Sequence, residues 1–125
     1  MQRLLNKVVL VTGAGNGIGR ASALRASAEG AAVCCVDIDA AALDALAAEI
    51  VEGGGEALAQ PCDISDESSV KACVAACVAR FGGIDAVVNM AGVLRFADTG
   101  EMTLEQWQRV IDINLTGTML LTREV

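Results

Sequence analysis

Histidine and tyrosine are both absent from this chain of 125 residues, and lysine occurs only as Lys7 and Lys71. Without histidine the chain lacks the side chain that most often acts as a general base or metal ligand near neutral pH. Without tyrosine it has no phenol that could donate or accept a proton. The sequence therefore offers few groups for acid–base catalysis.

Aromatic residues are almost absent as well, because the only ones are Phe81, Phe96 and Trp107. Hydrophobic residues nevertheless make up 54% of the chain and charged residues 20%, which is typical of a globular protein. Ala, Val, Leu and Ile must fill the core, and such small side chains suit close packing of helices on a sheet. The length predicts one domain over residues 1–125.

No cluster of basic residues interrupts a chain whose formal net charge is −7. An acidic surface repels phosphate backbones, so nucleic-acid binding is not expected. No apolar run reaches the roughly 20 residues that a membrane span needs. The N-terminus, MQRLLNKVVLVTGAG, has no long apolar segment followed by a small-residue cleavage site, so we expect a cytoplasmic protein.

Cysteine occurs five times, an odd number, and never as C-x-x-C. The five are Cys34, Cys35, Cys62, Cys73 and Cys77. Zinc sites need ligands at metal spacing, which this arrangement does not provide. The pattern favours reduced, mostly buried thiols in a reducing compartment over a metal or redox site.

Apolar runs alternate with helix-forming segments along the chain. Strands are predicted at 7–12, 31–37, 56–63 and 84–89, with helices at 18–29, after Asp39, from Ser65 as N-cap to Phe81, and after a Thr103–Gln106 capping box. The third strand is the weakest because Pro61 lacks an N–H donor. This alternation predicts an α/β fold, half of a doubly wound domain with a parallel sheet.

The segment VTGAGNGIG joins the first strand to the first helix. It does not fit G-x-G-x-x-G but fits T-G-x-x-x-G-x-G through Gly13, Gly17 and Gly19. One glycine permits the sharp turn, another lets the backbone approach a pyrophosphate, and the last allows close packing of helix on sheet. The helix N-terminus would add N–H donors and the positive end of its dipole. A purely structural glycine-rich turn is the alternative.

Acidic or amide side chains end the next three predicted strands: Asp37, Asp63 and Asn89. The carboxyl ends of parallel strands meet at one edge of the sheet, where ligands bind. Asp37 could hydrogen-bond the hydroxyls of an adenosine ribose and would repel a 2′-phosphate, which favours NAD over NADP. Each of these residues could otherwise be a solvated turn or cap residue.

Five motifs in order, TGAGNGIG, the acid at Asp37, CDIS, NMAG and DINLTG, resemble those of short-chain dehydrogenases/reductases and cover the whole chain. The resemblance implies a Rossmann-type sheet in the order 3-2-1-4 and NAD(P)-dependent hydride transfer between a secondary alcohol and a ketone. It also implies a dimer or tetramer.

The resemblance further implies a set of site residues. The cofactor-binding ones would be Gly13, Asn16, Gly17, Ile18 and Gly19 at the pyrophosphate, Asp37 and Ile38 at the ribose, Asp63 and Ile64 at the adenine, and Asn89, Ala91 and Gly92 near the nicotinamide side. Asn114 would be the one catalytic-group residue, its backbone helping to hold a water of the proton relay. On the residues alone, a polar residue at a helix kink or face is the favoured interpretation of Asn114.

The chain departs from the family at Met90, where a second Asn is common, and in having no Ser, Tyr and Lys of the catalytic group after Asn114. We therefore expect a chain truncated before those residues, able to bind NAD and inactive alone. Two alternatives stay open: a non-catalytic NAD-binding module, and a structural partner that pairs with a longer homologue.

The last helix is expected to carry an apolar stripe: Leu104, Trp107, Val110, Ile111, Leu115, Thr118 and Met119. Leu120 and Leu121 widen it. In the family this helix commonly packs in a dimer interface, so we expect a homo-oligomer, and poor solubility where the stripe and the fourth strand are left uncovered. Arg95 and Phe96 are candidates for the border of a substrate pocket, and a solvated loop would explain them equally well.

Overall fold

Four parallel strands form the sheet of the computed structural model, which describes residues 2–125. The strands are β1 (Val8–Thr12), β2 (Ala32–Asp37), β3 (Glu56–Pro61) and β4 (Ala86–Asn89). Their order is β3-β2-β1-β4, which confirms the predicted topology. The third strand was predicted to reach residue 63 and stops at Pro61. As the last residue of an edge strand, Pro61 withholds no hydrogen bond from a central ladder.

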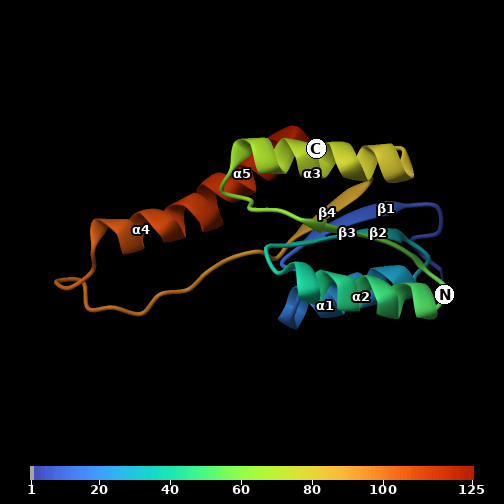
Figure 1. Cartoon of the computed structure of the whole chain (residues 1–125), viewed down its shortest axis with the longest axis horizontal. Coiled ribbons are helices and arrows are strands. Elements are labelled where there is room, and N and C mark those ends of the chain that lie inside the picture. Colours follow the sequence, from blue (N-terminus) through green and yellow to red (C-terminus); the bar gives the residue numbers. More distant parts are fainter. Residues whose placement is uncertain (1) are drawn as a thin grey trace.

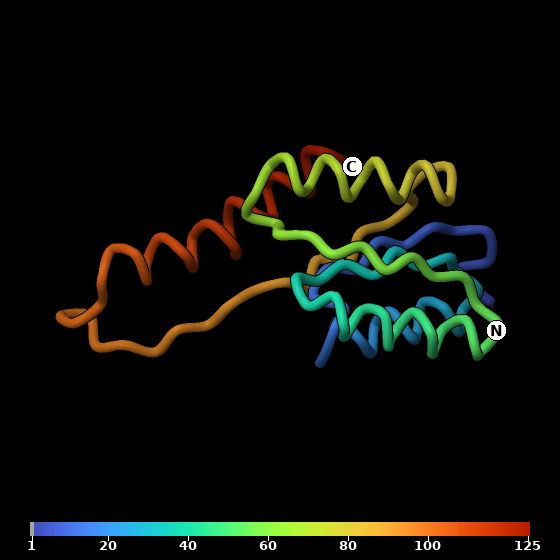
Figure 2. Tube along the Cα trace, viewed as in Figure 1, coloured from blue at the N-terminus to red at the C-terminus, as the bar shows by residue number. Residues whose placement is uncertain are grey.

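Helices cover both faces of this sheet (Figure 1). Helices α1 (Gly17–Ala28) and α2 (Ala40–Glu52) lie on one face, and α3 (Glu67–Phe81) and α5 (Gly117–Glu124) lie on the other. Helix α4 (Leu104–Ile111) projects from this body, and the segment between β4 and α4 runs out beside it (Figure 2). Within residues 2–125 no helix has the length and apolar character needed to cross a bilayer.

The two central strands are buried on both faces, which explains why they read as continuous apolar runs. Val8 and Leu10 of β1 pack with Cys34 and Val36 of β2 under α3 and α5. The alternate residues of the same strands join a second core under α1 and α2. Period-two alternation thus divides two apolar strands between two cores.

Side-chain caps start three of the helices. Asp39 accepts from Ala42 N at the start of α2, and Thr103 and Gln106 form the predicted capping box of α4. The prediction of Ser65 as the cap of α3 was wrong, because Asp66 holds that position and accepts from Ser68 N. Ser65 instead donates to Asp63, at 2.6 Å between the two oxygens.

The single α-helix predicted for the end of the chain is interrupted by a π-helical turn, η1 (Asp112–Thr116), between α4 and α5. A π turn adds one residue per turn and so rotates the side chains that follow. Leu120 and Leu121 are consequently buried against α3. Along the predicted apolar stripe, Leu104, Trp107, Leu115 and Met119 remain exposed.

Glu29, at the end of α1, is a buried acid that fastens the N-terminal segment to the body. Its Oε1 lies 2.7 Å from Nη2 of Arg3, and Arg25 also pairs with it. The hydrogen bonds from Arg3 lower the pKa of Glu29 to about 2, against the opposing effect of burial. The carboxylate is therefore ionised over the whole neutral and mildly acidic range.

Candidate functional site

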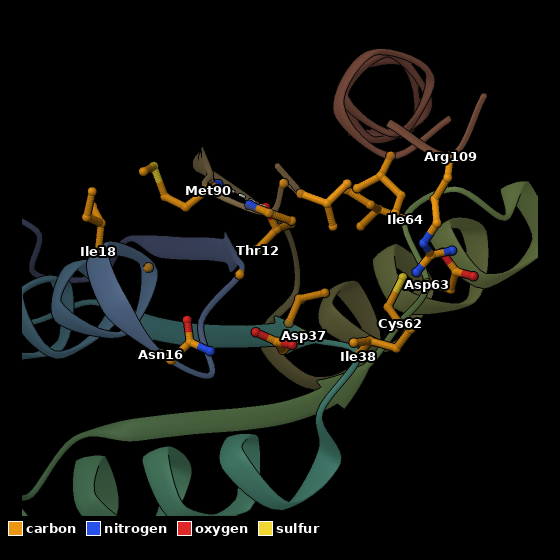
Figure 3. A pocket seen from close by; sticks show the side chains of 17 residues that line it. Thr12, Asn16, Ile18, Asp37, Ile38, Cys62, Asp63, Ile64, Met90 and Arg109 are labelled. Carbon is orange, nitrogen blue, oxygen red and sulfur yellow. Dashed lines mark hydrogen bonds between the residues drawn. The ribbon is translucent and has the colours of Figure 1, made fainter. Parts of the chain in front are cut away.

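A cavity of about 350 Å³ opens at the carboxyl ends of the four strands (Figure 3). The parallel register brings these ends together, since Thr12 is level with Val36 and Asn89, and Asp37 is level with Pro61. The lining consists of Thr12, Gly13, Asn16, Ile18 and Gly19, then Val36 to Ile38, Cys62 to Ile64, Met90 to Val93, and Arg109 and Ile113.

The glycine turn forms one end of this cavity. Gly13 has a φ of +64°, and a Cβ there would lie 2.8 Å from Ala91 N. A Cβ on Gly19 would lie 2.0 Å from the carbonyl oxygen of Gly13, so α1 can approach β1 only through a glycine. Gly17 has a φ of +57° and open space where its Cβ would be. The turn thus leaves its backbone uncovered at Gly17, whereas at Gly13 and Gly19 it packs too closely on other backbone atoms to admit a side chain.

Helix α1 begins at this turn without a side-chain cap, unlike α2, α3 and α4. Asn16 occupies its N-cap position, and the first turn contains no acidic residue. The first N–H groups of a helix have no intrahelical partner and carry the positive end of its dipole. This end of the cavity therefore fits an anion such as a pyrophosphate.

Asp37 lies in the middle of the cavity with both carboxylate oxygens oriented by the backbone. Its Oδ2 accepts from Gly15 N at 2.9 Å and its Oδ1 accepts from Asp39 N at 3.1 Å. A Cβ on Gly15 would lie 2.8 Å from Oδ2, so a side chain there would displace the carboxylate. Fixed acceptors of this kind suit the vicinal hydroxyls of a ribose.

The other end of the cavity combines an acid with apolar side chains. Asp63 accepts from the backbone and the hydroxyl of Ser65 through Oδ1 alone. Within residues 2–125, no hydrogen bond uses its Oδ2. Ile38 is 70% exposed although it lines the cavity, and Ile64 lies near the same end (Figure 3). A flat base with an amino group at its edge would fit such a surface.

Asn89 does not line the cavity, but its side chain connects elements that surround the cavity. Thr12 Oγ1 donates to Asn89 Oδ1 at 2.6 Å and accepts from Met90 N and Ala91 N. Asn89 Nδ2 donates to Thr118 Oγ1 at 2.8 Å, and this hydroxyl donates to the carbonyl of Asn114. A chain of hydrogen bonds thus joins β1, β4, the π turn and α5.

Asn114 lies inside the π turn and outside the cavity. Its side chain accepts from Val93 N and donates to Val93 O, both at 2.8 Å. Gly92 leaves room for this contact, because a Cβ there would lie 3.3 Å from Asn114 Oδ1. Asn114 therefore positions the segment that carries Ala91, Gly92 and Val93 along the cavity wall.

Residues 7–125 match the family model of short chain dehydrogenases. The chain belongs to this family. It is 43% identical over 123 residues to the D-threitol dehydrogenase of Mycolicibacterium smegmatis, covering 98% of this chain and 47% of that protein. It is 41% identical over 126 residues to a 3-oxoacyl-[acyl-carrier-protein] reductase of Synechocystis sp., covering 100% and 51%.

Solved structures of the family have the same fold as this chain. A short chain dehydrogenase from Mycobacterium smegmatis superposes with a TM-score of 0.95 at 36% identity, covering 99% of this chain and 52% of that one. A hydroxysteroid dehydrogenase from Escherichia coli superposes equally well at 32% identity, again covering 99% and 52%. The chain thus spans about half the length of the family members it matches.

Most residues that the sequence singles out for the cofactor line the cavity of this family member. Gly17, Asn89 and Asn114 lie beside it and not in its lining. The suggested border residues Arg95 and Phe96 do not line it either, and Phe96 is 89% exposed. Members of the family use a nicotinamide cofactor, and the bare N-terminus of α1 together with the oriented Asp37 fits one.

Sequence reasoning missed three polar contributors to the site: Thr12, Gly15 and Arg109. Thr12 stands next to the glycine turn, and its hydroxyl could have been read as the partner of Asn89. Gly15 could have been noticed as the remaining glycine of the turn. Arg109 gave no signal, because only the path of α4 beside the cavity brings it there.

The five cysteines are free and buried, as predicted. Burial raises the pKa of Cys35 to about 12. The pKa values of Cys34 and Cys62 are raised too, most strongly by hydrogen bonding to Cys73 and to a smaller extent by burial. In the part of the chain that the structure describes, no group of three or more Cys, Asp and Glu residues could hold a metal ion. Cys34, Cys35 and Cys62 therefore serve as small protonated core residues at neutral pH.

Proposed function

We propose that this chain forms the NAD-binding half of a short-chain dehydrogenase that interconverts secondary alcohols and ketones. Family members similar to it include D-threitol dehydrogenase, levodione reductase of Leifsonia aquatica and galactitol 2-dehydrogenase of Agrobacterium fabrum. Their names describe oxidation of alcohols or reduction of ketones. A homo-oligomer built through α4 and α5 is part of the same proposal.

Asp37 carries the choice of NAD over NADP. Its carboxylate is held in the cavity by Gly15 N–H and Asp39 N–H, where it can accept from both hydroxyls of the adenosine ribose. A 2′-phosphate in that place would lie against a fixed negative charge, which costs free energy at short range. Arg109 is the one cation that residues 2–125 contribute to the cavity lining, and it lies at the end occupied by Asp63.

The remaining residues bind and orient. The N–H groups at the start of α1 would hold the pyrophosphate, and Asp63 Oδ2 would accept from the adenine amino group. A bound nicotinamide would accept or donate the hydride. Asn114 would act by holding Val93 and by presenting its carbonyl from the π turn. We assign no proton donor within these 125 residues, which contain no tyrosine or histidine.

Calorimetric titration of the purified protein with NAD and with NADP tests this function. We expect tighter binding of NAD, and in Asp37→Ala a loss of about tenfold or more in NAD affinity, because hydrogen bonds to a charged acceptor are lost. In Asp37→Ala the ratio of the NAD affinity to the NADP affinity should also become smaller. Asp44→Ala removes an equal charge from the exposed surface of α2 and should bind as the wild type does. Tighter binding of NADP by the wild type would refute the role of Asp37.

A further inference from the structure

Arg109 reaches the cavity from an element that is otherwise detached from the body. Helix α4 has no buried residue and projects away from the sheet (Figure 1). Arg109 nevertheless lines the cavity, one helical turn before Ile113, which lines it too. Among residues 2–125 its guanidinium takes part in no ion pair within 4 Å, and Figure 3 shows it directed toward the end of the cavity that holds Asp63.

The place of Arg109 within the cavity identifies what it can touch. Figure 3 shows its side chain at the end where Asp63 and Ile64 lie, away from Asn16 and Ile18 at the start of α1. The phosphates of a dinucleotide bound at α1 would therefore be remote from the guanidinium. The adenine is the part of the ligand that would occupy the end with Asp63.

A guanidinium suits the face of a base better than other cations do. It is planar, delocalised and weakly hydrated, and it stacks on aromatic faces. Two apolar side chains, Ile38 and Ile64, also line the cavity near this end (Figure 3). A base bound beside them would contact aliphatic carbon and would also meet the guanidinium that α4 brings to the cavity.

We propose that Arg109 is an adenine-binding residue whose guanidinium stacks on the base and thereby docks α4 on the cavity. The proposal rests on the proposed function, since it requires an adenine dinucleotide in the cavity. It adds a contact from outside the glycine turn and the strand ends. It also gives α4, which has no buried residue of its own, a contact with the ligand.

Titration calorimetry with AMP, NAD and NADP on four proteins tests the stacking contact. The proteins are the wild type, Arg109→Ala, Arg109→Lys and the control Arg95→Ala, which removes the same charge from a residue outside the lining. We expect Arg109→Ala to weaken AMP and NAD by the same factor, about five- to tenfold. Arg109→Lys should not restore the affinity, because an ammonium has no plane to stack, and Arg95→Ala should bind normally.

Other results would overturn the proposal in distinguishable ways. Wild-type affinity in Arg109→Ala, alongside normal binding of NAD by the wild type, would remove the stacking contact and leave the proposed function intact. No binding by the wild type would remove both. Full recovery in Arg109→Lys would indicate a simple charge effect, and a larger loss for NADP than for NAD would indicate contact with a 2′-phosphate.

Hydrogen exchange provides a second measurement on the same variants. We expect AMP to slow exchange of the amides in residues 104–111 of the wild type and of Arg95→Ala, because α4 becomes docked. In Arg109→Ala the same amides should exchange as fast with AMP as without it. Equal protection in Arg109→Ala would contradict docking through this side chain.

Discussion

Gly19 packs against the preceding turn more closely than any side chain would allow. Its Cβ position lies 2.0 Å from the carbonyl oxygen of Gly13 and 3.1 Å from that of Thr12, and both atoms belong to the backbone. Backbone atoms cannot rotate away as the end of a flexible side chain can. An added methyl group must therefore push α1 off β1.

Gly19→Ala should lower the free energy of unfolding by about 1–3 kcal/mol, the usual cost of overpacking a tight contact. It should also abolish nucleotide binding, because the N–H groups of α1 would move with the helix. Chemical denaturation and calorimetry measure the two effects. Gly83→Ala adds the same methyl group where nothing lies within 4 Å, and it should do neither. Unchanged stability in Gly19→Ala would mean that the turn is not rigid.

Glu29 makes a pH-dependent contribution to stability through its contacts with Arg3 and Arg25. Its pKa is lowered to about 2 in the folded protein by the hydrogen bonds from Arg3, whereas an unfolded glutamate titrates near 4.5. The folded state thus binds the proton less readily than the unfolded state. The contribution of Glu29 is complete above about pH 4.5 and is lost as the pH falls toward 2.

Glu29→Gln should accordingly be less stable than the wild type at pH 7, and the difference between them should shrink steadily from pH 5 to pH 2. Urea denaturation at a series of pH values measures this difference. The exposed Glu52→Gln makes an equal change of charge and should follow the wild-type profile. A constant gap between Glu29→Gln and the wild type would show that the carboxylate does not titrate as described.

At the scale of elements, Thr118 links α5 to the sheet and to the π turn. Its hydroxyl accepts from Asn89 Nδ2 and donates to the carbonyl of Asn114, both at 2.8 Å. Valine has nearly the same shape and no hydroxyl. Thr118→Val would leave the partly buried Asn89 amide without its acceptor and the Asn114 carbonyl without this donor.

We expect Thr118→Val to destabilise the protein by about 1–2 kcal/mol, the cost of leaving such groups unpaired. Amides of the π turn should also exchange faster. Thr122→Val is a matched control, because Thr122 donates only to the carbonyl of Thr118 one turn earlier and is exposed. If the two variants unfold at the same denaturant concentration, the link through Thr118 contributes nothing beyond an ordinary helix bond.

The elements that sequence predicted well are those whose signals are local. Apolar runs gave β1 and β2, and Asp39 and Thr103 gave the starts of α2 and α4. Ser65 and Asp66 are adjacent, and both residue types are common N-caps. Asp66 caps α3 because the hydroxyl of Ser65 is bound to Asp63. The choice depends on a contact that sequence alone does not show.

The π turn could not be predicted, because its cause is tertiary. Asn114 is held to Val93 across the loop, while Leu120 and Leu121 are held against α3. In an uninterrupted α-helix, Asn114 could not face Val93 while Leu120 and Leu121 face α3. The extra residue in the π turn rotates the helix so that both contacts form. The mixed spacing of apolar residues and the polar Asn114 among them were its only traces in the sequence.

For the candidate site, the strand-end rule predicted a common edge for Gly13, Asp37, Asp63 and Asn89. The first three line one cavity, whereas Asn89 lies beside it. Arg109 illustrates the limit of that rule. Nothing in QWQRV distinguishes it from a solvated helix arginine, and its place at the cavity follows from the path of an element some 70 residues after Asp37 in the chain.

At the scale of the whole molecule, two apolar surfaces remain open. Leu104, Trp107, Leu115 and Met119 are exposed along α4, the π turn and α5. A groove beside β4, lined by Val9, Ala86 and Val88 together with residues of α1, is open because β4 pairs only with β1 in the described sheet. Exposed apolar area of this kind favours association, and an unpaired strand edge adds backbone donors and acceptors to it.

We therefore expect the 125-residue chain to self-associate, with a sedimentation coefficient that rises with protein concentration. The double variant Trp107→Lys/Leu115→Lys should shift it to the monomer, since lysine on an apolar contact surface costs desolvation of a charge. Val51→Lys changes an equally exposed apolar residue on α2, on the other face of the sheet, and should leave association unchanged. A monomer at every concentration would show that α4 and α5 form no contact surface. If Val51→Lys shifts the chain to the monomer as strongly as the double variant does, the effect is one of net charge, because each added lysine makes the acidic chain less negative.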